Sequence, residues 1–182
     1  MNLSQRYHHL ICNYIQAKDC NRPWFMTQAF SSDAILQMKV DTDNIDFPSE
    51  VLGQEAITET LVRNFARNNE NVFTFCLQDT VKIQSEQLDC DWVVFMTNKD
   101  TGEVRMGWGQ YYWSFTSGDS CLVDKLVIRI QQMDILPPSY QEGIFSMIGN
   151  FPYPWINSEV LLSGLRPVEY FDDLRFFLAT PS

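Results

Sequence analysis

Hydrophobic and polar residues alternate along Glu103 to Phe115, EVRMGWGQYYWSF, and this pattern predicts a long β-strand rich in aromatic residues. Because side chains alternate along a strand, one face carries Val104, Met106, Trp108, Gln110 and Tyr112. The other carries Arg105, Gly107, Gly109, Tyr111, Trp113 and Phe115. Two glycines on one face indicate a bend, a bulge or a close backbone approach. We therefore expect a central strand that bends, so that its sheet curls around a small apolar cavity.

The same period of two begins at Val72. It predicts strands at about 72–86, 90–99, 103–116 and 120–132. Turn residues separate them, within Gln87–Asp89, Lys99–Gly102 and Ser117–Asp119. A further strand is expected at 33–40. Successive hairpins of this kind favour an antiparallel sheet.

Helical spacing comes before these strands. Residues 3–18 place Leu3, Tyr7, Ile11 and Tyr14 on one stripe, which is typical of an amphipathic helix. A second helix is expected at 22–30, capped by Asn21, and a third at 53–68. Helices followed by antiparallel hairpins indicate an α+β fold.

The last fifty residues are less regular. Short helices are expected at 140–148 and 158–163, and the tail VEYFDDLRFFL is compatible with helix or strand. The aromatic segment FPYPWIN and this tail are read as a lid, a dimer arm or extra core. The prolines favour a fixed, extended path over a hinge.

Composition narrows the function classes. A length of 182 residues suits one domain, and a net charge of −10 disfavours nucleic acid and anionic membranes as partners. No apolar run is long enough to span a bilayer and no signal peptide is evident, so a cytoplasmic location is expected. The five cysteines are scattered without a CxxC, which argues against a metal site or a disulfide framework. No cofactor is expected.

The phrase YIQAKDCNRPWFMTQAFSSDAILQM resembles the start of the SnoaL-like, or nuclear-transport-factor-two-like, superfamily. The matching positions are Tyr14, Ala17, Asp19, Phe30 and Asp33–Ala34, followed by Gly53, Glu55 and Ile57.

The resemblance implies that residues 1–132 form a cystatin-like cone, in which a strongly curved antiparallel sheet wraps around the N-terminal helices. It implies a pocket at the open end, and a homodimer formed through the outer sheet face. Residues 133–182 would be a helical or irregular extension packed on the same domain. The superfamily includes isomerases, cyclases, dehydratases, epoxide hydrolases and non-catalytic modules, so it specifies fold better than function.

A ligand pocket in such a cone is expected between the first helix and the central strands. The residues assigned to it are Tyr14, Trp92, Met106, Trp108, Gln110 and Tyr112. Tyr14 is either a core tyrosine or a hydrogen-bond donor at the pocket floor. Gln110, polar on an apolar face, either pairs within the core or faces a ligand.

Catalytic residues are not identified by the pattern. The base of a ketosteroid isomerase would fall near Gln37 or Met38, and its second oxyanion donor near Gln110, so that chemistry is disfavoured. His8 and His9 are expected to be solvated on the first helix. Three carboxylates are candidate bases if they point inward; otherwise they are solvated or turn residues: Asp33, Asp91 and Asp124.

Three functional hypotheses follow. The first is a module that binds a small apolar or aromatic molecule in the cone. The second is a cofactor-independent dehydratase, isomerase or cyclase acting on a small hydrophobic substrate, which requires a titratable group in the pocket. The third is a structural or regulatory dimer whose cone is filled by its own aromatic side chains.

Overall fold

The computed structural model describes residues 2–118 and 121–180 of the chain, and a single mixed sheet organises the fold of these residues. Its strands run in the order β2-β1-β7-β6-β5-β3-β8, and β4 pairs with β5. Their bounds are β1 Phe30–Val40, β2 Glu50–Leu52, β3 Asn69–Leu77, β4 Lys82–Gln84, β5 Gln87–Asn98, β6 Val104–Phe115, β7 Val123–Leu136 and β8 Trp155–Ile156. The long strands β3, β5, β6 and β7 are antiparallel, whereas β1 pairs with β7 in parallel.

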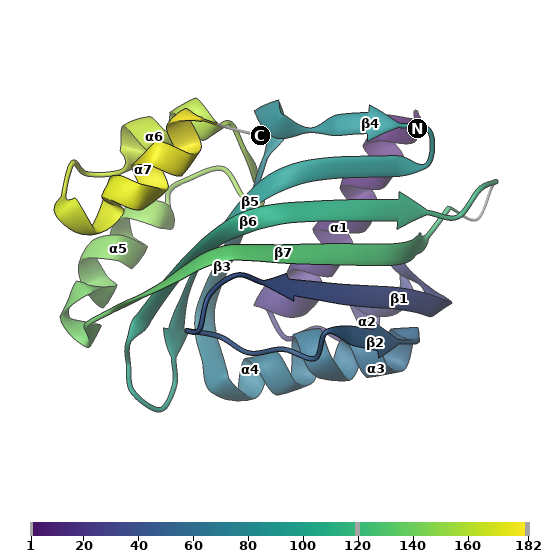
Figure 1. Cartoon of the computed structure of the whole chain (residues 1–182), viewed down its shortest axis with the longest axis horizontal. Coiled ribbons are helices and arrows are strands. Elements are labelled where there is room, and N and C mark those ends of the chain that lie inside the picture. Colours follow the sequence, from purple (N-terminus) through teal and green to yellow (C-terminus); the bar gives the residue numbers. More distant parts are fainter. Residues whose placement is uncertain (1, 119–120, 181–182) are drawn as a thin grey trace.

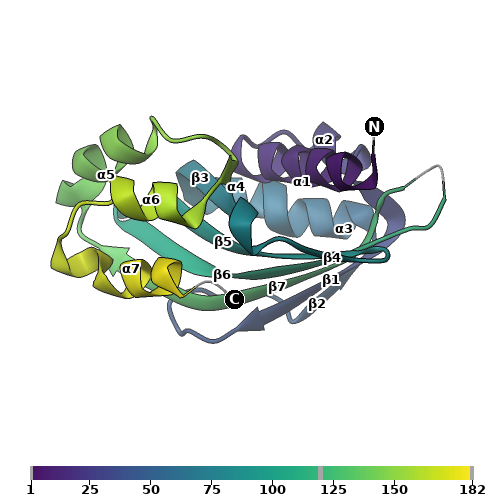
Figure 2. The same ribbon diagram turned by 90° about the horizontal axis from the view of Figure 1, so that it is seen from above.

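The helices divide into two groups (Figures 1 and 2). The N-terminal group comprises α1 Leu3–Asp19, α2 Trp24–Thr27, α3 Gln54–Thr58 and α4 Phe65–Asn68. The C-terminal group comprises α5 Gln141–Ile148, α6 Ser158–Gly164 and α7 Asp172–Ala179. The sheet is curved and not closed, so the predicted α+β cone with a helical C-terminal extension is confirmed.

Several boundaries differ from the predictions for physical reasons. The second helix stops at Thr27, because Phe30 already pairs with Val123 in the sheet. The expected cap, Asn21, instead has a φ of 49°. The strand expected at 72–86 breaks at Gln78–Thr80, where the Thr80 hydroxyl donates to the carbonyl of Leu77 and accepts the amide of Asp91.

Other differences extend the predicted pattern. The third helix is interrupted by a π-helical stretch, Glu59–Asn64, between α3 and α4. The tail proves to be helical in α7, and the polar stretch after β1 contains the short strand β2. Asp119, expected in a turn, lies outside the described residues.

The bend of the sheet lies at Gly109 of β6. Between Trp108 and Gly109 the pairing with β7 shifts from Gln132 to Ile130, so one residue of β7 is left over as a bulge. A Cβ atom built on Gly109 would lie only 1.9 Å from the carbonyl oxygen of Arg129. The glycine is therefore required by a close backbone approach, as its position in the strand predicts.

The two faces of the sheet are both buried, each by its own group of helices. Tyr111, Trp113 and Phe115 of β6 pack with the N-terminal helices in one apolar cluster. Met106 and Trp108, of opposite parity, pack with α5, α6 and α7 in a second cluster. A strand with apolar residues on both faces is what this double covering requires.

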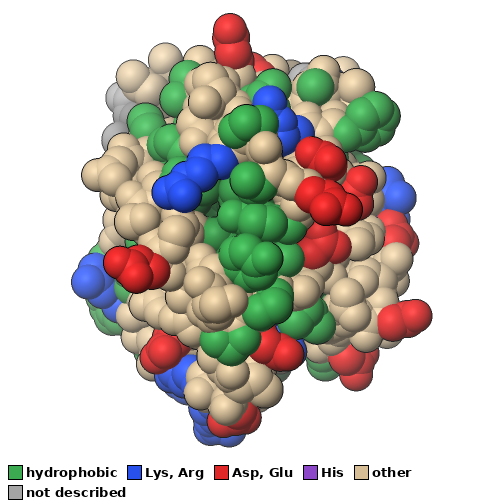
Figure 3. All heavy atoms as spheres, turned by 90° about the vertical axis from the view of Figure 1, so that its left-hand side faces the viewer, with side chains coloured by type: hydrophobic (Ala, Val, Ile, Leu, Met, Phe, Trp, Pro, Cys, Tyr) green, Lys and Arg blue, Asp and Glu red, His purple; other side chains and the backbone are tan. Residues whose placement is uncertain are grey.

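The C-terminal segment is fixed to the sheet by backbone and side-chain bonds. Trp155 of β8 pairs in parallel with Cys76 of β3. Asp79 accepts hydrogen bonds from the amide (2.8 Å) and the hydroxyl of Ser158, the first residue of α6. Figure 3 views the end of the molecule that carries α5, where hydrophobic side chains gather in a central strip between charged side chains.

No helix within residues 2–118 and 121–180 is long and apolar enough to cross a membrane.

Replacing Gly109 with alanine should destabilise the protein by about 2–3 kcal/mol, because the new Cβ would collide with the Arg129 carbonyl. The matched control is Gly143→Ala in α5, where a Cβ meets nothing within 4 Å. Since alanine is the better helix former, that variant should gain up to about 1 kcal/mol. Urea unfolding measures both; equal stabilities of the two variants would contradict the proposed bend.

The Asp79 cap predicts a dependence of stability on pH. Burial alone would raise the pKa of Asp79, but the bonds from Ser158 outweigh it and hold the pKa below the usual 3.8. The carboxylate thus stabilises the fold above pH 3.8, and this contribution is lost as the pH falls through the folded pKa.

Asp79→Asn should therefore lower the unfolding free energy by about 1 kcal/mol at pH 7. The difference from the wild type should shrink below about pH 4. Asp100→Asn, in an exposed turn, serves as the control. A difference that stays constant with pH would show that the charge of Asp79 is unimportant.

Candidate functional site

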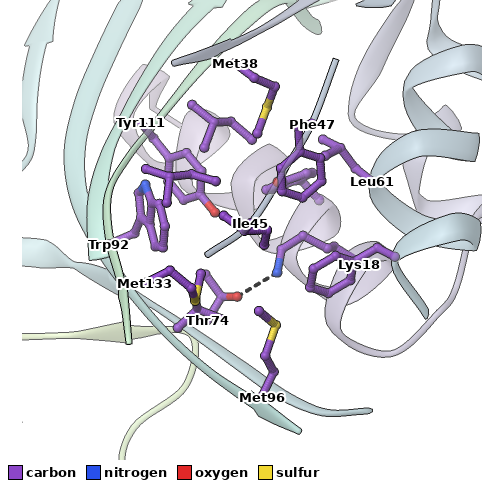
Figure 4. A pocket seen from close by; sticks show the side chains of 15 residues that line it. Lys18, Met38, Ile45, Phe47, Leu61, Thr74, Trp92, Met96, Tyr111 and Met133 are labelled. Atoms are coloured by element: carbon purple, nitrogen blue, oxygen red, sulfur yellow. Dashed lines mark hydrogen bonds between the residues drawn. The ribbon is translucent and has the colours of Figure 1, made fainter. Parts of the chain in front are cut away.

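A small cavity of about 40 Å³ lies inside the cone, between α1 and the concave face of the sheet. Apolar side chains form most of its wall, with three methionines on the sheet side: Met38, Met96 and Met133. Figure 4 shows the polar groups among them, notably the Lys18 ammonium and the Tyr111 hydroxyl. A void of this size holds one or a few water molecules.

Lys18 places a positive charge at the cavity. It lies in the last turn of α1, is 7% exposed, and its Nζ donates to Asp19 Oδ1 at 2.5 Å and to Thr74 Oγ1 at 2.7 Å. Nζ also lies 5.0 Å from the centre of the Phe65 ring, a distance suited to a cation–π contact. A charge in such a place is tolerable only when it is paired and hydrogen-bonded.

Asp19 supplies that pairing and is itself saturated with donors. Its Oδ2 accepts from the Thr74 amide (2.6 Å) and from the Tyr153 hydroxyl (2.7 Å), and its Oδ1 also accepts from Thr74 Oγ1 (2.9 Å). Burial, together with this neighbouring carboxylate, raises the pKa of Tyr153. The network thus joins the end of α1, strand β3 and the C-terminal segment.

Tyr14 brings a hydroxyl to the same cavity. The side chain is fully buried, and among the described residues its hydroxyl has no hydrogen-bond partner of normal geometry, although the Tyr111 hydroxyl lies near enough to influence it. Burial raises the pKa of Tyr14 strongly. The group is therefore a protonated donor without a well-placed acceptor.

The segment 41–49 closes the open end of the cone. Its half-buried Ile45 and Phe47 pack on the core and line the cavity (Figure 4). Three hydrogen bonds attach the segment to β7. Asn44 Nδ2 donates to the Met133 carbonyl (2.6 Å), the Asp41 amide donates to the Ile130 carbonyl (2.9 Å), and the Asp41 carboxylate accepts from Arg129 Nε (2.7 Å). The remainder of the segment is largely exposed.

An outer cleft of about 520 Å³ lies on the other side of this segment. It shares three wall residues with the inner cavity, namely Ile45, Phe47 and Phe65. The two spaces are thus separated by side chains of one loop and one helix.

Comparison with known proteins agrees with this architecture. No family model and no curated protein sequence matches the chain. Solved structures do match it. One is a candidate scytalone dehydratase from Novosphingobium aromaticivorans, with a TM-score of 0.55 and 14% identity over 74% of this chain and 93% of that one. The others are a type 2 hexachlorocyclohexane dehydrochlorinase, LinA (TM-score 0.56, 11% identity, 73% of this chain and 88% of that one), and a candidate isomerase from Rhodopseudomonas palustris (TM-score 0.56, 11% identity, 72% of this chain and 91% of that one).

The chain has the SnoaL-like, or nuclear-transport-factor-two-like, fold. Identities this low establish the fold alone, since one fold hosts many functions.

Within this SnoaL-like cone, two of the six predicted pocket residues, Tyr14 and Trp92, line the inner cavity. The other four were assigned to the wrong face of the sheet: Met106, Trp108, Gln110 and Tyr112. The alternation in β6 was predicted correctly, but the concave face is the one that carries the glycines and Tyr111. The opposite face is apolar because it packs on the C-terminal helices.

Gln110 and Tyr112 lie on that outer face, beyond the C-terminal helices. The Gln110 amide donates to Gln131 Oε1 at 3.4 Å, and Tyr112 is 36% exposed. The alternative in which Gln110 pairs with another side chain is therefore the one that the structure supports.

The candidate bases do not line the cavity. Asp33 is exposed, and Asp91, although buried, shares the outer face with Gln110. Asp124 lies at a register shift of β7 and is partly exposed. His9 is exposed, and His8 packs on Trp155. No group of three His, Cys, Asp or Glu side chains in the described residues is placed to hold a metal ion.

Lys18 and Thr74 were missed, although the sequence carries a signal for each. Lys18 continues the helical stripe of Tyr7, Ile11 and Tyr14 by one more step of four residues. A lysine on the buried stripe of a helix is a charge that needs a partner. Thr74 lies at an inward position of β3, within the strand predicted from Val72 onward.

Lys18→Met should lower the unfolding free energy by about 3 kcal/mol, because it leaves the buried Asp19 carboxylate without its cation. Lys39→Met, at an exposed position of β1, should change the free energy by less than about 0.5 kcal/mol. Chemical denaturation monitored by tryptophan fluorescence measures both variants. Equal effects would mean that the Lys18–Asp19 pair makes no special contribution.

Proposed function

We propose that this protein binds a small molecule with an apolar body and one accepting oxygen, such as a ketone, in the inner cavity of the cone. The observation that carries this proposal is the pair of donors, Lys18 Nζ and the Tyr14 hydroxyl, in a wall that is otherwise apolar. A buried hydroxyl without a well-placed acceptor costs free energy, and a ligand oxygen that accepts from it would remove that cost. A few placed polar groups among apolar ones are typical of ligand sites.

The cavity as it stands is too small for such a ligand. Ligand sites usually measure about 300 Å³ or more, whereas the cavity measures about 40 Å³. Ile45 and Phe47 occupy the remaining space, and they belong to a loop rather than to the sheet. Binding therefore requires the segment 41–49 to move outward. This movement takes Ile45 and Phe47 out of the cavity, and the apolar body of the ligand takes their place.

The chemistry of the two donors favours a neutral carbonyl oxygen. Because burial raises its pKa, Tyr14 stays protonated and donates. Three flexible methionine side chains in the wall can adapt to ligand shape. The structural neighbours named as a dehydratase and an isomerase support a small-molecule site in this fold.

Catalysis as a dehydratase, isomerase or cyclase is the second candidate, and the Lys18–Asp19 pair favours it, since Lys18 lines the cavity and is bonded to the Asp19 carboxylate. Asp19, however, accepts bonds from Lys18, Thr74 and Tyr153, which leaves it poorly placed to accept a substrate proton. Simple binding therefore has the better support.

Acetophenone and α-methylstyrene form a matched pair of probes, since they differ in an oxygen that replaces a methylene group. Acetophenone should raise the melting temperature more, because only its oxygen accepts from Tyr14 and Lys18. Tyr14→Phe should remove most of that difference, whereas Tyr112→Phe on the outer face should preserve it. If neither probe shifts the melting temperature at saturation, a filled cone becomes the better account.

Tyr14→Phe should also separate binding from stability. Its hydroxyl lacks a well-placed partner, so its removal should leave the unfolding free energy unchanged or raise it by up to about 1 kcal/mol. A loss of more than about 1 kcal/mol would assign Tyr14 to the core rather than to a ligand site.

The homodimer stays a prediction. Light scattering would test it by measuring the molar mass of the protein in solution.

A further inference from the structure

The outer cleft contains a cation that the inner cavity does not explain. Arg105 of β6 lines this cleft, and no ion pair with an acidic side chain is formed by it within residues 2–118 and 121–180. Its Nε is buried and has no hydrogen-bond partner among those same residues. A buried donor without an acceptor costs free energy in the closed state.

Arg105 lies on the concave side of the sheet. It shares parity with Gly107, Gly109 and Tyr111, and across the ladder it is paired with Met96, which lines the inner cavity. Gly107, two residues further along β6, would bring a Cβ within 2.5 Å of Met133, another residue of the cavity wall. Two residues of strand span roughly 7 Å, so the guanidinium lies a short chain length from the inner cavity.

The surroundings of Arg105 select the kind of anion. A guanidinium binds a carboxylate through two parallel hydrogen bonds. The exposed carboxylates of Asp43 and Asp46 stand on the same cleft, and their repulsion disfavours a multiply charged group such as a phosphate. Asn69 adds a buried Oδ1 without a partner among the described residues, which suits a donor such as a bound water or a ligand hydroxyl.

We infer that the ligand is an amphipathic carboxylate whose apolar part carries the accepting oxygen of the proposed function. Arg105 binds its charged end in the outer cleft, and its apolar part displaces Ile45 and Phe47 and brings that oxygen to the donors of the inner cavity. This inference rests on the proposed function, because the apolar end needs the inner cavity. It adds the charge of the ligand and the direction from which it enters.

The test compares octanoate with 1-octanol by isothermal titration calorimetry on the whole protein. Wild type should bind octanoate at least about tenfold more tightly than octanol, as expected for a charge-assisted contact. Arg105→Gln should abolish that preference and leave the affinity for octanol unchanged. Arg166→Gln, the same change of charge at an exposed position outside both spaces, should behave as wild type.

The possible failures are distinguishable. Equal binding of octanoate and octanol to wild type and to Arg105→Gln overturns the role of Arg105 and leaves the cavity proposal standing. An equal loss of octanoate binding in Arg105→Gln and Arg166→Gln also overturns the role of Arg105, because such a result would show a non-specific effect of charge. If neither compound binds and acetophenone also fails, the proposed function falls together with the inference.

Discussion

The close approach of β6 to β7 at Gly109 is the constraint on which the rest of the architecture depends. Because Gly109 has no Cβ, the Arg129 carbonyl can occupy the position that a side chain would fill. One extra residue of β7 forms a bulge there. The strands bend there instead of continuing flat. Residues on the concave side pack with α1 to α4, and residues of opposite parity pack with α5 to α7. Figure 2 shows the two helix groups at opposite ends of the sheet.

A buried ion pair then joins the segments that this bend brings together. Lys18 and Asp19 end α1, Thr74 belongs to β3, and Tyr153 belongs to the C-terminal segment. The Lys18–Asp19 pair, which places a positive charge at the cavity, therefore also connects α1, β3 and the C-terminal segment through hydrogen bonds. A change at Lys18 affects both fold and site, and for this reason Tyr14, whose hydroxyl contributes no well-formed bond, separates the two more cleanly.

Much of this fold could be predicted from the sequence, because its signals are local. The stripe from Tyr7 to Tyr14 predicts α1, the period of two predicts the strands, and the glycines of β6 predict the bend. The choice of inner face could not be predicted, because Met106 and Trp108 are as apolar as Tyr111 and Trp113. Only the tertiary position of the C-terminal helices distinguishes the two faces, and their docking depends on contacts between distant residues such as Asp79 and Ser158.

The site was predictable to a smaller extent. Tyr14 and Trp92, which were assigned from periodicity, line the inner cavity, whereas Ile45 and Phe47 lie in a polar segment that has no periodicity to interpret. Their role as a cover depends on where the loop folds back across the cone. The outer cleft is likewise a product of tertiary structure, since Arg105 reads in the sequence as an ordinary strand residue.

The most direct test of a cavity that opens for a ligand is a titration with acetophenone followed by NMR of methyl-¹³C-labelled methionine. The chain has 7 methionines, of which Met38, Met96 and Met133 line the cavity and Met106 and Met147 belong to the opposite cluster. The account predicts saturable shifts for the first three methyl groups and none for Met106 and Met147. Shifts centred on Met106 and Met147, or no shifts at all, would contradict it.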